Sequence, residues 1–309
     1  MPDQPGFKRR VFAKPILFFA IFRNDFHARM VCFPTAGEQI MEQRLDYYSL
    51  VGFKSGSTSP DELARLRIEP ERTALFLDFD GTFVDIAPTP DAIRVTDRDK
   101  TLLDQLSKRT SGAVSVISGR NLHEIDSYLS DFQGTVSGGH GAEMRREAKA
   151  LPTIKCDLER LEHIKCAVRE FAAVDPRILA EDKSFGIVLH FRQHPELEGK
   201  VRDFVRSLVG GDADFEIQQA KMALEIKPKG ISKAMAIERI MKFKEFRRRT
   251  ILFAGDDDTD EIAFSWVNEQ GGITIKIGDG LTLARYRTRN PASFKKWLRE
   301  QLKSASKGA

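Results

Sequence analysis

Short apolar runs alternate with stretches of helical periodicity along most of the chain, and this alternation restricts the fold more than any other feature. Apolar runs of about four to eight residues that end at a glycine or a polar cluster are typical of buried strands. Strands that alternate with helices form a parallel sheet with helices on both faces, so we predict an α/β fold. The predicted strands are residues 73–79, 113–117, 251–254 and 273–277, and the predicted helices are 97–108, 122–129, 232–241 and 258–267.

The pattern changes in the middle of the chain, where amphipathic helices are predicted at 158–171 and 201–208. Strands are predicted there at 185–191, 215–217 and 222–226. We interpret this stretch as an α+β insertion rather than as a continuation of the same sheet. The predicted organisation is a poorly ordered extension at 1–70, a core formed by 71–150 and 227–309, and an inserted domain at 151–226.

The net charge of +4 is concentrated at the N-terminus, where residues 1–33 hold six Lys or Arg and two acids. The other residues are neutral by count and contain no base-reading motif, so the charge does not favour a nucleic-acid partner. Cys32, Cys156 and Cys166 are widely spaced and odd in number. This favours a reducing, cytoplasmic setting over a disulfide scaffold or a Cys/His metal site.

The N-terminal segment 11–22 (VFAKPILFFAIF) follows two arginines and leaves three interpretations open. It is a weak membrane or partner anchor within residues 8–33, a secretory signal without a small-residue cleavage site, or a disordered or non-native extension. A transmembrane helix needs roughly 20 apolar residues, and this run is shorter. We therefore expect no transmembrane segment.

Residues 78–82 (DFDGT) place two carboxylates at the end of the first predicted strand. Ligands of parallel sheets bind outside the carboxyl ends of the strands, and alternate strand residues share a face. Asp78 and Asp80 can then point at one ligand, and a bound Mg²⁺ would offset their repulsion. The alternative is a solvated turn, because acids are common at turns.

Three further signals lie at predicted strand ends. Ser118 precedes a predicted helix, where a hydroxyl and backbone amides could hold an anion. Lys233 lies in the first turn of the helix after Ser232, although a solvated lysine is the ordinary alternative. Residues 255–261 (GDDDTDE) contain five acids, of which helix capping explains one or two. A divalent cation explains the others.

These motifs, in this chain order, resemble the haloacid dehalogenase (HAD) superfamily of aspartyl phosphotransferases, and more closely its trehalose-6-phosphate phosphatase family. The resemblance covers roughly residues 71–305, and one departure is Gly139, where we expect Leu in this family. It implies a Rossmann-like HAD core with an inserted C2-type cap, and an enzyme active in trehalose biosynthesis. The motifs that carry it are residues 78–82, 118–120, 139–143, 224–230, 255–261 and 276–284.

The residue types and the resemblance together imply a mechanism with Mg²⁺ as the cofactor. Asp78 would attack phosphorus, and Asp80 would protonate the leaving sugar oxygen and then activate water. Ser118 and Lys233 would hold the phosphoryl oxygens. The metal would be held by Asp78, the Asp80 backbone carbonyl and Asp256, with Asp257 or Asp260 supporting through water.

The resemblance also implies that the cap closes over a small-molecule substrate, trehalose 6-phosphate, and excludes water. Each implied sugar contact could instead be an ordinary surface charge, and His140 could be a satisfied histidine at the seam between core and cap. The implied substrate-binding residues are Gly119, Arg120, His140, Gly141, Glu143, Lys183, Arg192 and Glu225.

Two alternatives remain open from the sequence. Another HAD sugar-phosphate phosphatase, of the sucrose-phosphate or mannosylglycerate-phosphate type, would share the catalytic motifs and differ in the cap. A receiver domain of a response regulator also phosphorylates an Asp beside Mg²⁺ and a Lys, and acts as a binding switch. Asp80 argues against the receiver, because a switch needs no second acid to protonate an alcohol.

Overall fold

The structure is a computed structural model, and it describes residues 60–87, 92–147, 149–151, 156–220 and 222–304. The chain divides into two units, 1–56 and 57–309, and every described residue belongs to the second. The predicted contact segment 8–33 and most of the predicted extension therefore lie outside the described residues. Among the described helices, none combines the length and the apolar character that crossing a membrane requires.

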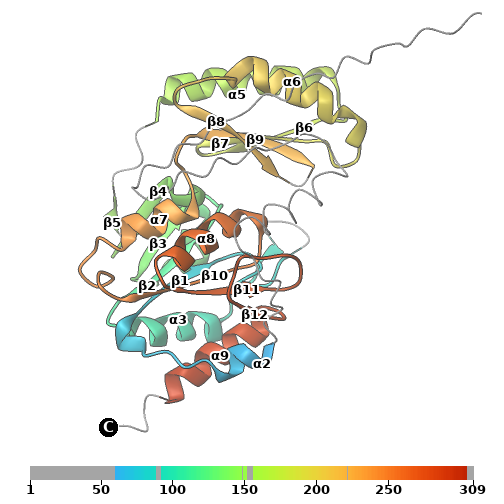
Figure 1. Cartoon of the computed structure of the whole chain (residues 1–309). Coiled ribbons are helices and arrows are strands. Elements are labelled where there is room, and N and C mark those ends of the chain that lie inside the picture. Colours follow the sequence, from blue (N-terminus) through green and yellow to red (C-terminus); the bar gives the residue numbers. More distant parts are fainter. Residues whose placement is uncertain (1–59, 88–91, 148, 152–155, 221, 305–309) are drawn as a thin grey trace, which may run out of the picture. The chain divides into compact units, whose positions relative to one another are not determined.

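An eight-stranded sheet forms the centre of the larger part, with the order β12-β11-β10-β1-β2-β3-β4-β5 (Figure 1). The strands from β12 to β3 pair in parallel, and β4 and β5 are added as antiparallel edge strands. The first strand along the chain, β1, therefore lies inside the sheet between β10 and β2. The strands are β1 (Thr73–Asp78), β2 (Val114–Ile117), β3 (Thr135–Gly138), β4 (Glu143–Arg146), β5 (Lys149–Ala150), β10 (Thr250–Gly255), β11 (Ile273–Ile277) and β12 (Tyr286–Thr288).

Helices cover both faces of this sheet, and β1 shows why. Leu75 and Leu77 belong to one buried cluster, together with side chains of α2, α3, α4 and α9. Ala74 and Phe76 point to the opposite face and pack with α7 and α8. The predicted α/β class is confirmed. The helices are α2 (Pro60–Arg65), α3 (Asp97–Arg109), α4 (Leu122–Leu129), α7 (Lys233–Ile240), α8 (Glu261–Glu269) and α9 (Pro291–Ser304), with short 3₁₀ turns η1 (Pro70–Arg72), η3 (Gly139–Gly141) and η5 (Asp258–Asp260).

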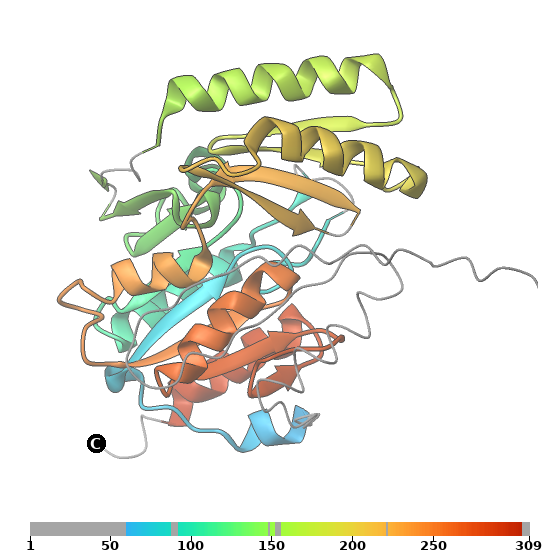
Figure 2. The ribbon, with the colours of Figure 1, turned by 45° about the horizontal axis from the view of Figure 1, so that its top comes forward.

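A separate four-stranded antiparallel sheet, order β6-β7-β9-β8, forms the inserted α+β part, which we call the cap. Its helices lie together on one face of the sheet (Figure 2). The helix-covered face is apolar and includes Ile187, Leu189, Leu224 and Ile226, whereas the other face carries polar side chains. The elements are α5 (Leu158–Val174), β6 (Leu179–Lys183), β7 (Gly186–His190), η4 (Pro195–Leu197), α6 (Glu198–Val209), β8 (Phe215–Ala220) and β9 (Ala223–Pro228).

The folded core begins earlier than the predicted boundary at residue 71. Leu63 and Ile68 are buried in the same cluster as α9, and the Ile68 amide donates to Gln301 Oε1 at 3.2 Å. The apolar face of α2 needs this cover, so residues 60–70 belong to the core rather than to an extension. At the other boundary, β9 continues to Pro228, two residues beyond the predicted end of the cap.

Candidate active site

A cavity of about 540 Å³ lies where the carboxyl ends of the core strands meet the polar face of the cap sheet. This is the edge at which parallel α/β sheets bind ligands. The core and the cap both contribute charged side chains to this cavity. The core contributes Asp78, Asp80, Ser118, Arg120, His140, Lys233 and Asp256 to its lining, and the cap contributes Glu181, Lys183, Phe185, Glu225 and Lys227.

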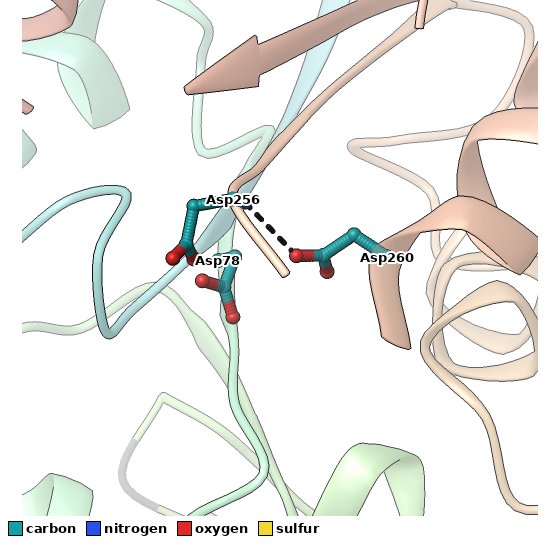
Figure 3. A group of neighbouring side chains, drawn as sticks. All are labelled: Asp78, Asp256 and Asp260. Carbon is teal, nitrogen blue, oxygen red and sulfur yellow. Dashed lines mark hydrogen bonds between the residues drawn. The ribbon is translucent and has the colours of Figure 1, made fainter. Parts of the chain in front are cut away.

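Three carboxylates gather at this edge of the sheet (Figure 3), and two of them, Asp78 and Asp256, line the cavity. Asp78 ends β1, Asp256 directly follows β10, and Asp260 lies just before α8. One carboxylate oxygen from each lies within 4.8 Å of the others. Because β1 and β10 are paired in parallel, their ends bring these acids together from distant parts of the chain.

Lys233 is the cation that holds two of these acids. Its Nζ donates to Asp78 Oδ1 and to Asp260 Oδ1, each at 2.6 Å, and all three side chains are buried. Lys233 begins α7, which Ser232 caps by accepting a hydrogen bond from the Met235 amide. Burial alone would lower the pKa of Lys233, but Asp260 and Asp78 raise it above its usual value. Lys233 therefore stays charged and fixes the Asp78 carboxylate.

Asp260 acts as a support rather than as an open ligand. Its Oδ1 is bound to Lys233, and its Oδ2 accepts from the backbone amides of Asp256 and Asp257 at 3.0 and 2.9 Å. Gly255 makes room for it, because a Cβ at that position would lie 2.3 Å from Asp260 Cγ. The two amide contacts fix the loop that carries Asp256.

The carboxylates of Asp78 and Asp256 suit a divalent cation. Asp78 Oδ1 accepts from Lys233, Asp256 Oδ1 accepts from Thr82 Oγ1 at 3.2 Å, and the Asp78 and Asp256 side chains also interact with each other. Burial and the neighbouring acids raise the pKa of Asp78 well above its usual value, and raise that of Asp256 to about 6. Buried carboxylates in this state are stabilised by a hard cation, which prefers oxygen ligands.

Gly81 explains why the turn after Asp80 admits Asp256. Its φ is +74°, a left-handed conformation that favours glycine, and a Cβ there would lie 2.1 Å from Asp256 Oδ2. A side chain at this position would therefore displace a proposed metal ligand. The glycine that marked the turn in the sequence is required by the geometry of the carboxylate cluster.

Asp80 lines the same cavity but is held differently. Arg120 donates to both of its carboxylate oxygens, Nε to Oδ2 at 2.7 Å and Nη2 to Oδ1 at 2.9 Å. This bidentate pair engages both carboxylate oxygens of Asp80 and directs the side chain toward Arg120. Asp257, also predicted near the metal, lines the cavity and caps η5 with its carboxylate.

Ser118 and His140 form the wall beside Asp78. Ser118 follows β2, and its Oγ accepts from the Arg120 amide at 3.1 Å. His140 donates its backbone amide to the Ser118 carbonyl at 2.9 Å, and its ring packs on Gly119, where a Cβ would lie 2.6 Å away. Burial and the charges of Lys233, Lys227 and Lys183 lower the pKa of His140 to about 3. The imidazole is therefore neutral at physiological pH.

Three residues predicted to contact substrate are not among the described residues that line this cavity. Glu143 accepts from the Leu122 amide at 2.8 Å and so supports the start of α4. Gly141 packs on Ser232, and its carbonyl accepts from Arg239 at 3.1 Å, which supports α7. Arg192 is exposed beyond the last residue of β7, at the end opposite to the turn that reaches the cavity.

The cap side of the cavity is a set of polar side chains on one face of the sheet. In the strand register, Glu181 is paired with Val188, and Val188 is paired with Glu225, so their side chains share a face. Lys183 forms an ion pair with Glu181, and burial raises the pKa of Glu225. We call Glu181, Lys183 and Glu225 the polar cap wall.

Comparison with known proteins identifies the family to which this arrangement belongs. The family model for trehalose-phosphatase matches residues 76–290, which includes the carboxylate cluster and the polar cap wall. The chain belongs to the trehalose-phosphatase family. The match begins inside β1 and ends just before α9, so it spans the core and the cap together.

Two bacterial relatives of this family are similar over most of their lengths. A probable trehalose-phosphate phosphatase of Sinorhizobium fredii is 35% identical over 235 residues, which cover 74% of this chain and 86% of the relative. The trehalose-6-phosphate phosphatase of Escherichia coli is 34% identical over 225 residues, covering 73% and 85%.

Solved structures show the same fold at lower identity. The C-terminal domain of the Candida albicans trehalose-6-phosphate phosphatase has a TM-score of 0.67 at 20% identity, covering 81% of this chain and 99% of that one. A haloacid dehalogenase-like hydrolase of Bacillus subtilis has a TM-score of 0.54 at 14% identity, covering 75% and 99%. The predicted fold relationship is therefore confirmed.

The trehalose-phosphatase cavity contains four charged residues that were not predicted from the sequence, Glu124, Glu181, Asp182 and Lys227. Two of them lie two positions from a predicted residue on the same strand, Glu181 before Lys183 and Lys227 after Glu225. The period of two in a strand was the available signal. Lys227 Nζ also donates to the Ile231 carbonyl at 2.6 Å, so it connects β9 with the segment that leads to Lys233.

Proposed function

We propose that this chain hydrolyses trehalose 6-phosphate to trehalose and phosphate through an aspartyl-phosphate intermediate, with Mg²⁺ as the cofactor. The observation that supports it most is the buried Asp78 carboxylate, fixed by Lys233 beside Asp256 and facing a cavity with a polar second wall. Family membership and the names of the relatives support the substrate.

The first step is attack of a carboxylate oxygen of Asp78 on phosphorus, which breaks the bond to the sugar oxygen and forms an acyl phosphate. Asp80 donates a proton to the departing sugar oxygen, because a sugar alkoxide is a poor leaving group. In the second step Asp80 accepts a proton from water, whose oxygen attacks phosphorus, and Asp78 is released as a carboxylate. Ser118 and Lys233 hold the phosphoryl oxygens throughout.

The cation would be held by Asp78 Oδ2, Asp256 Oδ2 and the Asp80 carbonyl. When bound, Mg²⁺ neutralises negative charge between the carboxylate nucleophile and the phosphate. Asp260 keeps Asp256 in place through the loop amides, and Lys233 keeps Asp78 from turning away. Raised pKa values at Asp78 and Asp256 support this assignment, because they show that the site lacks positive charge for its acids.

Asp80 must turn from its pair with Arg120 toward the sugar oxygen before it can act on that oxygen, because both of its carboxylate oxygens are held by the guanidinium. A substrate phosphate is an alternative partner for the guanidinium. Arrival of the phosphate beside Arg120 would therefore free Asp80 for the first step. This places Arg120 among the groups that bind substrate.

The polar cap wall would bind the sugar hydroxyls of the substrate. A site built to hydrogen-bond hydroxyls rejects ligands that lack them, which suits a disaccharide. The cap, described here by residues 156–220 and 222–228, would close over the core and exclude water during the first step. Arg192 would not take part, because it does not line the cavity.

Phosphate release from a panel of sugar phosphates, with Mg²⁺ and with a chelator, tests this proposal. Trehalose 6-phosphate should be hydrolysed, and sucrose phosphate and mannosylglycerate phosphate should be hydrolysed far more slowly. Preference for either of those substrates would replace the substrate assignment with a related phosphatase. A stable phosphoaspartate without turnover would instead indicate a receiver-like switch, and chelator-resistant activity would refute the metal assignment.

The N-terminal segment is proposed to be dispensable for this chemistry. Every proposed catalytic group lies between Asp78 and Asp260, and residues 57–309 form a unit by themselves. A chain beginning at residue 57 should therefore fold and retain turnover. We also propose a cytoplasmic setting, and weak contact of residues 8–33 with anionic membranes at about 1 kcal/mol per basic residue. Salt-sensitive vesicle binding by the full chain alone would support that contact.

A further inference from the structure

The turn at the tip of the cap approaches the core backbone at a glycine. Phe185 lies in the turn between β6 and β7, is half-buried and lines the cavity. Gly139 follows β3 on the core side, with a φ of +54°. A Cβ at Gly139 would lie 3.7 Å from Phe185 Cδ2 and 3.3 Å from Ala142 Cβ. The aromatic ring therefore stands where a larger side chain of residue 139 would project.

The tip that carries Phe185 moves with the whole cap sheet. Lys183 is paired with Gly186 across the turn, which leaves two residues between the strands. Gly186 is buried against β9, and a Cβ there would lie 2.7 Å from the Ile226 carbonyl oxygen. This close approach fixes the turn against the neighbouring strand. The Phe185 backbone is therefore held by the same strands that carry the polar cap wall.

The contact also lies next to groups that face the substrate. His140 follows Gly139 directly, and Lys183 is separated from Phe185 by one residue. All four of these residues line the same cavity. The distance between the ring and residue 139 therefore sets how far Lys183 and its neighbours stand from the phosphate site.

We propose that Phe185 is a positioning residue for cap closure. Its ring packs over Gly139, which has no side chain, at a position that we call the seat. This packing sets the distance between the polar cap wall and the core when the cap closes over the substrate. This inference rests on the proposed function, because closure is assigned to substrate binding there. A bulky side chain at residue 139 would occupy the seat and hold the cap wall away from the sugar. Removal of the ring would free the seat again.

A double-mutant cycle in the full chain tests this, with Gly139→Leu, Phe185→Ala and the double variant. Displacement of a binding group by about 1 Å can cost about 10²-fold in rate. Gly139→Leu should therefore lower kcat/KM for trehalose 6-phosphate by about 10²-fold. A small aryl phosphate, which needs only the core, should lose less than about threefold. The double variant should recover about tenfold over Gly139→Leu.

Gly139→Ala is the matched control, because it brings the same left-handed backbone strain without reaching into the ring. Equal losses for Gly139→Ala and Gly139→Leu would overturn the proposal, as would losses that simply add in the double variant. An equal loss on both substrates would show damage to the core instead. A loss in Phe185→Ala that falls on kcat for trehalose 6-phosphate supports positioning.

Thiol cross-linking separates this inference from the proposed function. In a chain with Cys32, Cys156 and Cys166 replaced by Ser, the pair Gly139→Cys and Phe185→Cys should form a disulfide with diamide as the oxidant. The pair Gly139→Cys and Arg192→Cys, at the other end of the cap sheet, should not. Absence of the first cross-link overturns the seat even if trehalose 6-phosphate is hydrolysed. Formation of the cross-link, together with no hydrolysis of trehalose 6-phosphate by the unaltered chain, supports the seat and refutes the proposed function.

Discussion

The two walls of the cavity hold their charged groups in opposite ways. On the core wall, Asp78, Asp260 and Lys233 are buried and bound to one another, and backbone amides complete the arrangement. On the cap wall, Glu181 and Lys183 are partly exposed and form an ion pair, and Glu181 also contacts His190 at 2.8 Å. The core wall is therefore preorganised, whereas the cap wall can exchange its internal contacts for those of a ligand.

This difference separates chemistry from recognition. A nucleophile and its metal ligands must stand in place before the reaction, because their reorganisation would raise the barrier. Groups that recognise hydroxyls need to release their own partners when the sugar arrives. Variants of the core wall should consequently affect every phosphate ester, and variants of the cap wall should affect only substrates that reach it.

The largest effect is expected at Asp78. Asp78→Asn removes the nucleophile and should lower turnover of both trehalose 6-phosphate and a small aryl phosphate by at least about 10⁴-fold. Phosphate release and trapping of the phosphoenzyme measure it. Asp85→Asn is the matched control, because Asp85 is exposed in the same loop. Retained turnover of the aryl phosphate would contradict the assignment of chemistry to the core wall and recognition to the cap wall.

Removal of the metal should lower the turnover of both substrates nearly as much as Asp78→Asn does. Metal binding should also depend on pH. The raised pKa of Asp256, about 6, means that a proton competes with the cation below that pH. The apparent Mg²⁺ affinity should fall about tenfold per unit below pH 6, which isothermal titration at pH 7.5, 6.5 and 5.5 would show.

The stability of the metal-free protein should change with pH in the opposite direction to the Mg²⁺ affinity. Between the unfolded pKa of about 4 and the folded value near 6, the native state binds more protons than the unfolded state. Stability from this group is therefore lost as the pH rises through that window, and Mg²⁺ should raise Tm most above it. A Tm shift on adding Mg²⁺ that is the same at pH 5 and pH 7.5 would contradict the site.

The cap wall should give a smaller and selective loss. Lys183→Ala and Glu225→Ala should each lower kcat/KM for trehalose 6-phosphate by about 10²-fold and leave the aryl phosphate within about threefold. Arg192→Ala serves as the control from the same sheet, and its kinetics should match those of the unaltered chain. A selective loss in Arg192→Ala would show that the cap binds the sugar at its other end.

The smallest effect concerns His140 and appears in stability. Its folded pKa of about 3 lies below the unfolded value of about 6.5, so its contribution is complete above pH 6.5 and is lost as the pH falls toward 3. His140→Gln should reduce the pH dependence of the unfolding free energy between pH 7.5 and 5 by about 2 kcal/mol. Urea unfolding at both pH values measures this difference. An unchanged pH dependence of the unfolding free energy would indicate that the His140 side chain is exposed to solvent.

Much of the fold could be predicted because the buried parallel strands are apolar runs ended by glycine or acids. β1, β2, β10 and β11 have this pattern. β3 (TVSG), β5 (KA) and β12 (YRT) are too short and polar to show a period, and the sheet defines them only through pairing. The start of the core was placed too late because α2 is short, and its partner α9 lies at the other end of the chain.

Site residues could be predicted where the end of a strand determines their position. They were predicted less well where their role depends on the direction of the side chain. Asp78, Ser118 and Asp256 lie at the carboxyl ends of adjacent strands, so the order of the sheet brings them together. Glu143 and Arg192 have the residue types of substrate ligands, but one supports a helix amide and the other lies beyond the far end of its strand. A single sequence does not show in which direction these two side chains point.

The position of β1 also determines the order in which the chain can fold. Its neighbour β2 follows closely in the sequence, but its other neighbour, β10, is separated from it by the entire cap. The cap sheet pairs only strands within its own segment, so it can form while the core still lacks β10. Non-local pairing is slow because a long loop must close first. During synthesis, β1 would therefore keep one unpaired edge until the cap has emerged, and that edge is where aggregation of newly made chains should begin.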